Sequence, residues 1–326
     1  MNESITQTPV AVAHGLSLPR QVQRGNPLLR RLYGFLDLLY LTARRLYYHF
    51  GLSLLSLLGV ILAIGLVSSA AFFSQAVETV IMRQELAEYS RVTGRPPFSS
   101  RVFTASTRTV PLTLERTETL AGNVSETLSA EVGLPVRSVG MLADSGVLAL
   151  QPLPDDERYA GRRSLGDASL AYMKEVAPHI VIEGAPLDDG QSDAALDVWM
   201  HSELGGRLGI QLGDAFNLTG NQGQISIPIR IAGFWHAADP KDPFWFSDPD
   251  QTLREKLFVR RGDYLSHVEP YLETKVRSVT WYVVLDETRA RPSGARGYAD
   301  GWQHAAAVVK RYLPDAQLTL PSVPLA

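Results

Sequence analysis

The architecture of this chain is decided by one apolar run, Gly51-Leu-Ser-Leu-Leu-Ser-Leu-Leu-Gly-Val-Ile-Leu-Ala-Ile-Gly-Leu-Val-Ser-Ser-Ala-Ala-Phe-Phe73. No Asp, Glu, Lys or Arg interrupts it. A helix needs about 20 apolar residues to cross the hydrocarbon core of a bilayer, where it pairs its backbone polar groups internally. The run therefore predicts a transmembrane helix over residues 50–74. We expect its membrane-anchoring side chains to be Leu52, Leu55, Leu58, Ile61, Leu62 and Phe72.

Two other readings of the run are a cleaved signal peptide and the core helix of a soluble protein. A signal peptide has an apolar segment of about 7 to 15 residues close to the N-terminus, whereas this run is longer and starts at Gly51. A core helix seldom extends this far without a charge. Length therefore favours a membrane anchor over both.

Charges on either side of the run predict its orientation. Lys and Arg close to a span favour the cytoplasmic side. The arginines before the run are Arg20, Arg24, Arg30, Arg31, Arg44 and Arg45. Acidic residues dominate after it, at Glu78, Glu85 and Glu88. We therefore expect residues 1–49 in the cytoplasm and the chain from about residue 75 outside.

The predicted cytoplasmic arm has two parts. Residues 1–25 are polar and aperiodic, which is typical of disorder. Residues 26–49 carry leucines and aromatics at three- and four-residue steps, bounded by arginine pairs. This pattern predicts a basic amphipathic helix at the membrane surface. Its interfacial basic residues are Arg30, Arg31, Arg44 and Arg45. A soluble helix packed on a partner subunit is the alternative, and the two are compatible.

Beyond the span we expect a stalk helix over residues 75–96, ended by Pro96 and Pro97, and then a domain over residues 97–326. Patterning predicts strands at 101–106, 136–142, 147–152, 179–183, 215–218, 224–234, 256–259 and 279–285. It predicts helices at 112–131, 165–176, 194–208 and 302–313. The irregular alternation favours an extracytoplasmic α+β fold on a single N-terminal transmembrane helix.

Composition and motifs give little support for catalysis. The chain has no cysteine, which excludes disulfides and thiolate chemistry, and its net charge of −3 gives no reason to bind nucleic acid. No nucleophile motif, metalloprotease motif or phosphate-binding loop is present. Asp239, Asp242, Asp248 and Asp250 cluster, but proline and aromatic residues interrupt them, so turn formation is favoured over calcium binding. His179 and Glu183 flank a predicted strand and are expected to face solvent. We expect no enzyme activity, cofactor or metal.

A loop rich in aromatic residues is the best candidate contact site. It contains Trp235, Phe244, Trp245 and Phe246. Trp235 ends a predicted strand, and packing into the core is the favoured reading for it. Neighbouring residues in an extended loop alternate sides, so we expect at least one of residues 244–246 to be exposed and to contact a partner.

Four segments together resemble a known family. These are Arg44-Arg45 leading into residues 54–63, the run 202–214 with Gly209 and Gly213-Asp214, the strand 227–235, and residues 239–246. They are similar to the FtsX-like (MacB-type) permeases of ATP-binding-cassette (ABC) systems over about residues 27–320. The resemblance implies an amphipathic helix, a first span and a MacB-like periplasmic core domain. Where the family's strand ends in Val-Gly, this chain has Ala232-Gly233.

The resemblance implies a transmembrane subunit of an ABC-type export or mechanotransmission complex. Its partners would be a cytoplasmic ATPase subunit, further permease spans or a second permease half, and the lipid bilayer. The family carries further spans after the outer domain, whereas no second apolar run of that length occurs here. An alternative is a membrane-anchored module that regulates a cell-envelope enzyme. An anchored hydrolase is the least favoured, because no catalytic constellation is visible.

Overall fold

The structure is a computed structural model that describes residues 38–319, apart from 43, 45, 46, 48, 49, 155, 160, 189, 193, 194 and 221–223. The predicted disordered arm, most of the amphipathic helix, and Arg30, Arg31 and Arg45 lie outside the described residues. Those described between 38 and 50 are helical. The chain divides into two compact units, Met1–Ser74 and Gln75–Ala326, and we call the second the folded domain.

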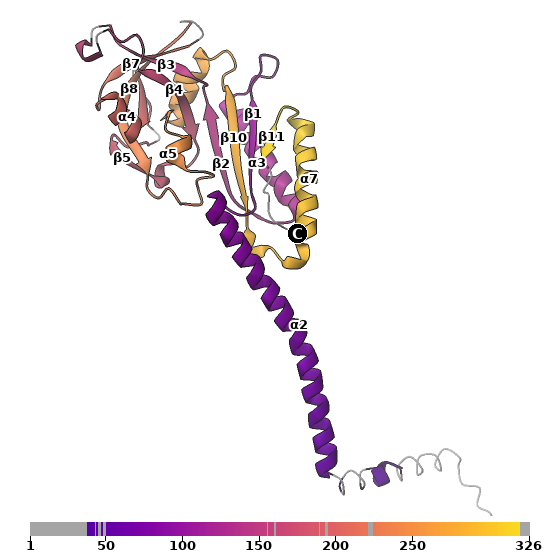
Figure 1. Cartoon of the computed structure of the whole chain (residues 1–326). Coiled ribbons are helices and arrows are strands. Elements are labelled where there is room, and N and C mark those ends of the chain that lie inside the picture. The colour runs from indigo at the N-terminus through magenta and orange to yellow at the C-terminus, as the bar shows by residue number, and fades with distance from the viewer. Residues whose placement is uncertain are drawn as a thin grey trace, which may run out of the picture. The chain divides into compact units, whose positions relative to one another are not determined.

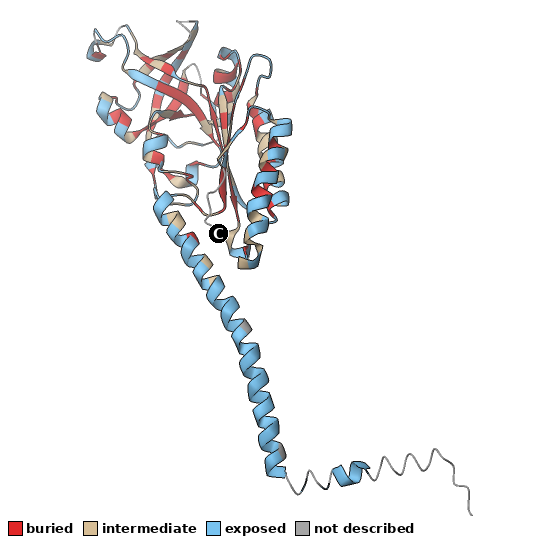
Figure 2. Cartoon of the chain, turned by 45° about the vertical axis from the view of Figure 1, so that its right-hand side comes forward, coloured by how far each residue is buried: buried red, intermediate tan, exposed pale blue. Residues whose placement is uncertain are grey.

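The apolar run forms part of helix α2 (Phe50–Thr93), which by length and composition can cross a membrane (Figure 1). The six predicted anchor side chains are exposed by between 54% and 73%. Figure 2 shows the first half of α2 as exposed on all sides. Exposed leucine and isoleucine on every face of a helix are unfavourable in water and favourable in lipid. The run is therefore not part of the core of this chain.

The predicted stalk is continuous with the span, because α2 runs to Thr93 without a break. The helix ends at Gly94, whose positive φ of 64° suits a glycine and whose N–H donates to Ser90 O at 2.9 Å. Near this end Leu86 is buried in the core of the folded domain. The predicted end of the stalk at residue 96 therefore lies three residues beyond Thr93, the last residue of α2.

One end of the folded domain is an open antiparallel sheet covered by two helices on one face (Figure 1). Its strand order is β11 (Gln317–Thr319), β1 (Ser99–Ala105), β10 (Ser278–Leu285) and β2 (Val136–Asp144). The covering helices are α3 (Leu114–Val132) and α7 (Ala295–Tyr312), which pack on each other. Trp281 of β10 fixes α3 by donating from Nε1 to Thr117 O at 3.0 Å.

The other end of the domain is a closed ring of strands. It runs β4 (Gly166–Met173), β3 (Leu148–Pro152), β7 (Ala215–Gly220), β8 (Ile225–Ala237), β6 (Leu196–His201) and β9 (Lys256–Phe258). The ring closes because β9 pairs with both β6 and β4. Strand β5 (Ile180–Gly184) pairs with β8 outside the ring. Strand β2 joins the two ends by pairing with β4 only over Leu142–Asp144.

The remaining elements are short. The α-helices are α4 (Ser202–Leu208), α5 (Pro249–Thr252) and α6 (Arg261–Asp263). There is one short π-helix among the described residues, η4 (Tyr264–Val268). The short 3-10 helices are η1 (Glu157–Tyr159), η2 (Ala177–His179), η5 (Glu269–Tyr271), η6 (Glu287–Arg289) and η7 (Pro292–Gly294). The mixed α/β composition predicted for the domain is confirmed.

Two predicted helices were wrong. Within 165–176 the structure has strand β4, and within 194–208 it has strand β6 followed by the short helix α4. All six residues of β6 and most of β4 are buried. A strand covered on both faces loses its polar alternation, so its apolar run cannot be told from a buried helix. The short strand β11 was not predicted.

The turn that resembles the permease family has a structural role. Gly209 caps α4 with a positive φ of 72°, directly after residue 208, where the predicted helix ends. Asp214, which follows Gly213, accepts hydrogen bonds from the Arg158 guanidinium at 2.6 Å and from Tyr159 Oη at 3.1 Å. This carboxylate is buried, and it ties the turn to η1.

Candidate functional site

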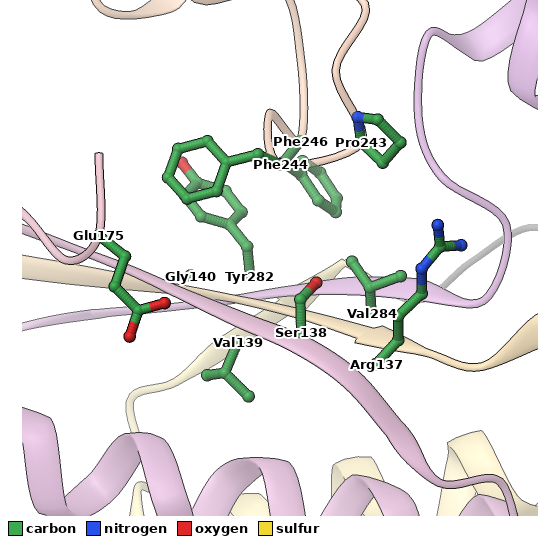
Figure 3. A pocket seen from close by; sticks show the side chains of 10 residues that line it. All are labelled: Arg137, Ser138, Val139, Gly140, Glu175, Pro243, Phe244, Phe246, Tyr282 and Val284. Carbon is green, nitrogen blue, oxygen red and sulfur yellow. The ribbon is translucent and has the colours of Figure 1, made fainter. Parts of the chain in front are cut away.

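A hollow of about 170 Å³ lies on the face of the open sheet opposite α3 and α7 (Figure 3). Its floor is formed by β2 and β10, through Ser138, Gly140, Tyr282 and Val284. Its roof is the segment 243–246, which the sequence identified as the candidate contact loop. Figure 3 shows Val139 pointing to the other side, toward the helices. The hollow therefore lies between the predicted contact loop and two strands that are distant from it in the sequence.

The roof segment is built from successive tight turns. Asp239 accepts a hydrogen bond from Lys241 N at 2.9 Å, and Asp242 accepts one from Phe244 N at 2.8 Å. Asp248 in turn caps α5 by accepting from Asp250 N at 3.0 Å. Aspartates bind backbone N–H groups in this way in Asx turns. The structure thus gives three aspartates of the predicted cluster roles in turns and caps.

The turns place the aromatic side chains differently from the prediction. Trp245 is 3% exposed and Phe246 6% exposed, while Phe244 is half-buried. The expectation that one of the three is exposed was wrong, because it assumed an extended loop with strict alternation. A chain that turns at every second or third residue can direct several neighbours inward. The role of these residues in contacting a partner stays a prediction.

Trp235 is completely buried, which agrees with the inward packing favoured for it. Its ring lies 4.6 Å from those of both His201 and Phe258, measured between centroids. His201 is buried and contacts Asp250 at 3.0 Å. These contacts hold α5 and β8 together, and they leave Trp235 no surface for a partner. As a contact residue Trp235 is therefore excluded in this fold.

His179, which was predicted to face solvent, instead supports the roof from η2. Its ring stacks on Phe244 with centroids 3.8 Å apart and planes 5° from parallel. Its Nδ1 contacts Asp242 Oδ2 at 2.8 Å. Partial burial acts to raise the pKa of Asp242, but hydrogen bonds from Phe244 N and His179 outweigh it, so the pKa lies below its ordinary value. The ionised carboxylate therefore holds both the turn and the histidine.

Phe246 and Tyr282 form the inner wall of the hollow. Their rings are 5.1 Å apart and inclined by 28°. The guanidinium carbon of Arg95, just beyond the end of α2, lies 5.0 Å from the centroid of the Phe246 ring. A second hollow of about 220 Å³ lies beside the first and shares Arg137 and Pro243 with it. Ser90, Gly94 and Arg95 also line it, so the roof segment lies against the C-terminal end of α2.

Opposite charges flank the first hollow (Figure 3). Arg137 lies at one end and donates from Nη1 to Glu287 at 2.6 Å. Glu175 lies at the other end with its side chain 74% exposed, and among the described residues it forms an ion pair with Lys174 at 3.7 Å. Sequence reasoning missed both, together with Tyr282 and His179. Nothing in their local sequence marks them, because strand pairing alone brings them beside the loop.

Other polar clusters of the domain serve packing. Asp263 of the Arg-Gly-Asp sequence is fully buried and accepts from Ser192 N and Oγ, each at 2.8 Å. Arg260 lies between Asp188, Asp197 and Asp263 and over the Trp199 ring. Across the described residues, no three His, Asp or Glu side chains converge as a metal site would require. The aromatic hollow, which is lined by two of the four predicted contact residues, is therefore the candidate functional site.

Comparison with known proteins gives few matches. No protein-family profile matches the sequence. No curated protein matches it either. Among solved structures, the chain is similar to one described as a "domain of a putative Permease protein" from Porphyromonas gingivalis, at 10% identity and a TM-score of 0.35. The match covers 69% of this chain and 89% of that one. A similarity this distant assigns neither a family nor a function.

Proposed function

We propose that this chain is the transmembrane subunit of an ABC-type export or mechanotransmission complex, related to the FtsX-like (MacB-type) permeases. It would supply the first span and the extracytoplasmic domain of a plasma-membrane transporter. ATP hydrolysis would reside in a separate cytoplasmic subunit. Further spans or a second permease half would complete the membrane part. This chain would then perform no chemistry and would transmit motion.

The observation that supports this proposal most is the continuity of α2. One helix includes both the apolar, exposed run and the segment around Leu86, whose side chain is buried in the folded domain. Met82, one turn earlier, also packs against this core. Side chains that are buried on folding move with the domain that buries them. A helix with such side chains is suited to passing movement of a span to the domain, whereas a simple anchor needs only a flexible tether.

The test begins with the tagged full chain, purified in mild detergent from the membranes of its own cells. We expect a nucleotide-binding subunit to copurify and the complex to hydrolyse ATP. Addition of ADP and vanadate should then change the hydrogen exchange of the folded domain. Copurification of a cell-envelope enzyme, with no nucleotide-binding subunit, would instead favour the regulatory module.

A matched pair of variants at Ala76 tests the role of the continuous helix. Proline inside a helix removes a hydrogen bond and breaks or kinks it, at a cost of about 3 kcal/mol or more. Ala76→Pro should therefore abolish the response of the domain to ADP and vanadate while the span still inserts. Ala76→Leu keeps a good helix former at the same exposed position and should preserve the response. An unchanged response in Ala76→Pro would refute transmission through α2.

A further inference from the structure

Strand β2 has a free edge beside the aromatic hollow. On one side β2 pairs with β10 along its length, but on the other side it pairs with β4 only from Leu142 to Asp144. Strand β4 ends at Met173, and the chain leaves the sheet at Glu175, whose φ of 59° is unusual for a residue with a side chain. Among the described residues, no strand pairs with this edge of β2 over residues 136–140, and these residues are exposed or half-buried.

The last hydrogen bond between β2 and the segment after β4 shows which backbone groups of β2 point toward the free edge. Lys174 N donates to Met141 O at 3.0 Å on this side. In an antiparallel ladder, residues two apart present their N–H and C=O groups to the same side. The backbone groups of Val139 therefore face the free edge, and among the described residues they have no partner there. Arg137 stands as the extra residue of a bulge, since Ser138 pairs with Val284 and Val136 with Leu285.

The hollow next to this edge has the size of a site for a side chain. Its volume of about 170 Å³ is below the roughly 300–1,000 Å³ of sites for small-molecule ligands. Phe244, Phe246 and Tyr282 give the hollow apolar walls. Gly140 lies at its floor and has no side chain to fill it. A strand laid along β2 would direct every second side chain to this face of the sheet. One of them would enter beneath Phe244.

We propose that the free edge of β2 binds an extended segment of a partner protein, which adds a strand to the sheet and inserts one large apolar side chain into the hollow. Strand addition of this kind takes affinity from main-chain hydrogen bonds and specificity from side-chain pockets. Arg137 and Glu175 flank the hollow at opposite ends. Arg137 binds Glu287 through Nη1 and keeps its other guanidinium donors for a carboxylate of the segment, while Glu175 suits a basic residue of the segment. The binding requires neither an ATPase nor a transported substrate, and it is tested independently of them.

The experiment uses the full chain in lipid nanodiscs and a phage-displayed library of random seven-residue peptides as the probe. We expect enriched peptides to share a large apolar residue next to Asp or Glu. Selected peptides are then synthesised with a fluorescent label, and their affinity is measured by polarisation. In the free protein the Val139 amide should exchange hydrogen quickly, and bound peptide should slow it. Absence of any enriched peptide would refute the proposal.

Two variants remove the two parts of the site separately. Val139→Pro deletes the outward N–H, which an edge strand tolerates because no ladder bond uses it. Gly140→Leu fills the hollow, since a Cβ there meets Tyr282 at an ordinary 3.5 Å. We expect each to weaken binding about tenfold, because an unmade hydrogen bond or a lost apolar contact costs roughly that much.

The control is Ile182→Pro, on the exposed strand β5. The backbone N–H and C=O groups of His179 and Val181 face β8, because Ala238 N donates to His179 O at 2.9 Å. The backbone groups of Ile182, the next residue, face the opposite side. Its N–H therefore also points away from the ladder, and Ile182 does not line the aromatic hollow. Binding should be unchanged in this variant. Equal loss in the control, or full binding by Val139→Pro, would overturn the proposal. So would a dimer of the chain that Val139→Pro dissociates, since a second copy would then cover the edge.

Discussion

Gly301 of α7 lies directly against the carbonyl oxygen of Glu131 in α3. A Cβ at this position would be 2.4 Å from Glu131 O and 2.8 Å from Val132 Cα. Both atoms belong to backbone, so neither can move aside by a rotamer change. The two helices that cover the open sheet can approach this closely only because position 301 has no side chain.

The first prediction concerns this helix contact. Gly301→Ala should destabilise the folded domain by about 1–3 kcal/mol, because the helices must separate to admit the methyl group. Gly297→Ala, on the same helix with nothing within 4 Å, is the control. It should leave stability unchanged or raise it by up to about 1 kcal/mol, since alanine is the better helix former. Urea unfolding followed by circular dichroism measures both, and equal effects would contradict the packing.

A second prediction concerns acid sensitivity at Asp242, whose pKa in the folded chain lies below its usual value of 3.8. A carboxylate with a lowered pKa stabilises the fold above the unfolded value, and this stabilisation is lost as pH falls through the folded value. Asp242→Asn should therefore be less stable than the parent at pH 7. The difference should shrink as pH falls below about 4. A difference that stays constant between pH 7 and pH 3 would show that the charge of Asp242 does not matter.

The third prediction concerns the span. Leu58→Arg should impair membrane insertion, because an arginine near the centre of a transmembrane helix costs about 2.5–3.5 kcal/mol. Leu58→Ala changes the size of the same exposed side chain without adding charge, and it should insert like the parent. Alkaline extraction of membranes distinguishes integral from released protein. If Leu58→Arg remains as resistant to extraction as the parent, another segment anchors the chain.

The fourth prediction is the topology, with the N-terminus in the cytoplasm and the folded domain outside. The chain has no cysteine, so single introduced thiols report on one position each. A membrane-impermeant maleimide should label Thr107→Cys in intact spheroplasts, because residue 107 lies in an exposed loop of the folded domain. Ser17→Cys should react only after the membrane is permeabilised. The reverse pattern would invert the orientation that the arginines predict.

Local sequence identified most elements whose pattern repeats at short range. The strands at 136–144 and 278–285 and the helix at 114–132 were predicted within a few residues. The failures are β4 and the first half of the predicted helix at 194–208, both buried strands. For such segments the deciding information is which strands lie on either side, and that information is not local.

For the candidate site, sequence identified only the roof. It marked Phe244, Trp245 and Phe246 by composition but assigned them the wrong exposure. The turns favoured at Asp239 and Asp242 are present, and they remove the side-to-side alternation that was assumed for an extended loop. It gave no sign of Tyr282 or Arg137. These two residues reach the loop through the pairing of β10 with β2, which joins positions 282 and 140 across the sheet.

The amino-acid sequence by itself determined that this chain carries a helix able to cross a membrane, because an apolar run of that length is sufficient for that conclusion whatever surrounds it. It also determined the C-terminal cap of α4 at Gly209, which depends on the backbone freedom of a single residue. Only the tertiary structure decided the closed ring, the burial of Trp245 and the free edge of β2. Each of these depends on where one strand ends relative to another, and hydrogen bonds between distant segments set that register.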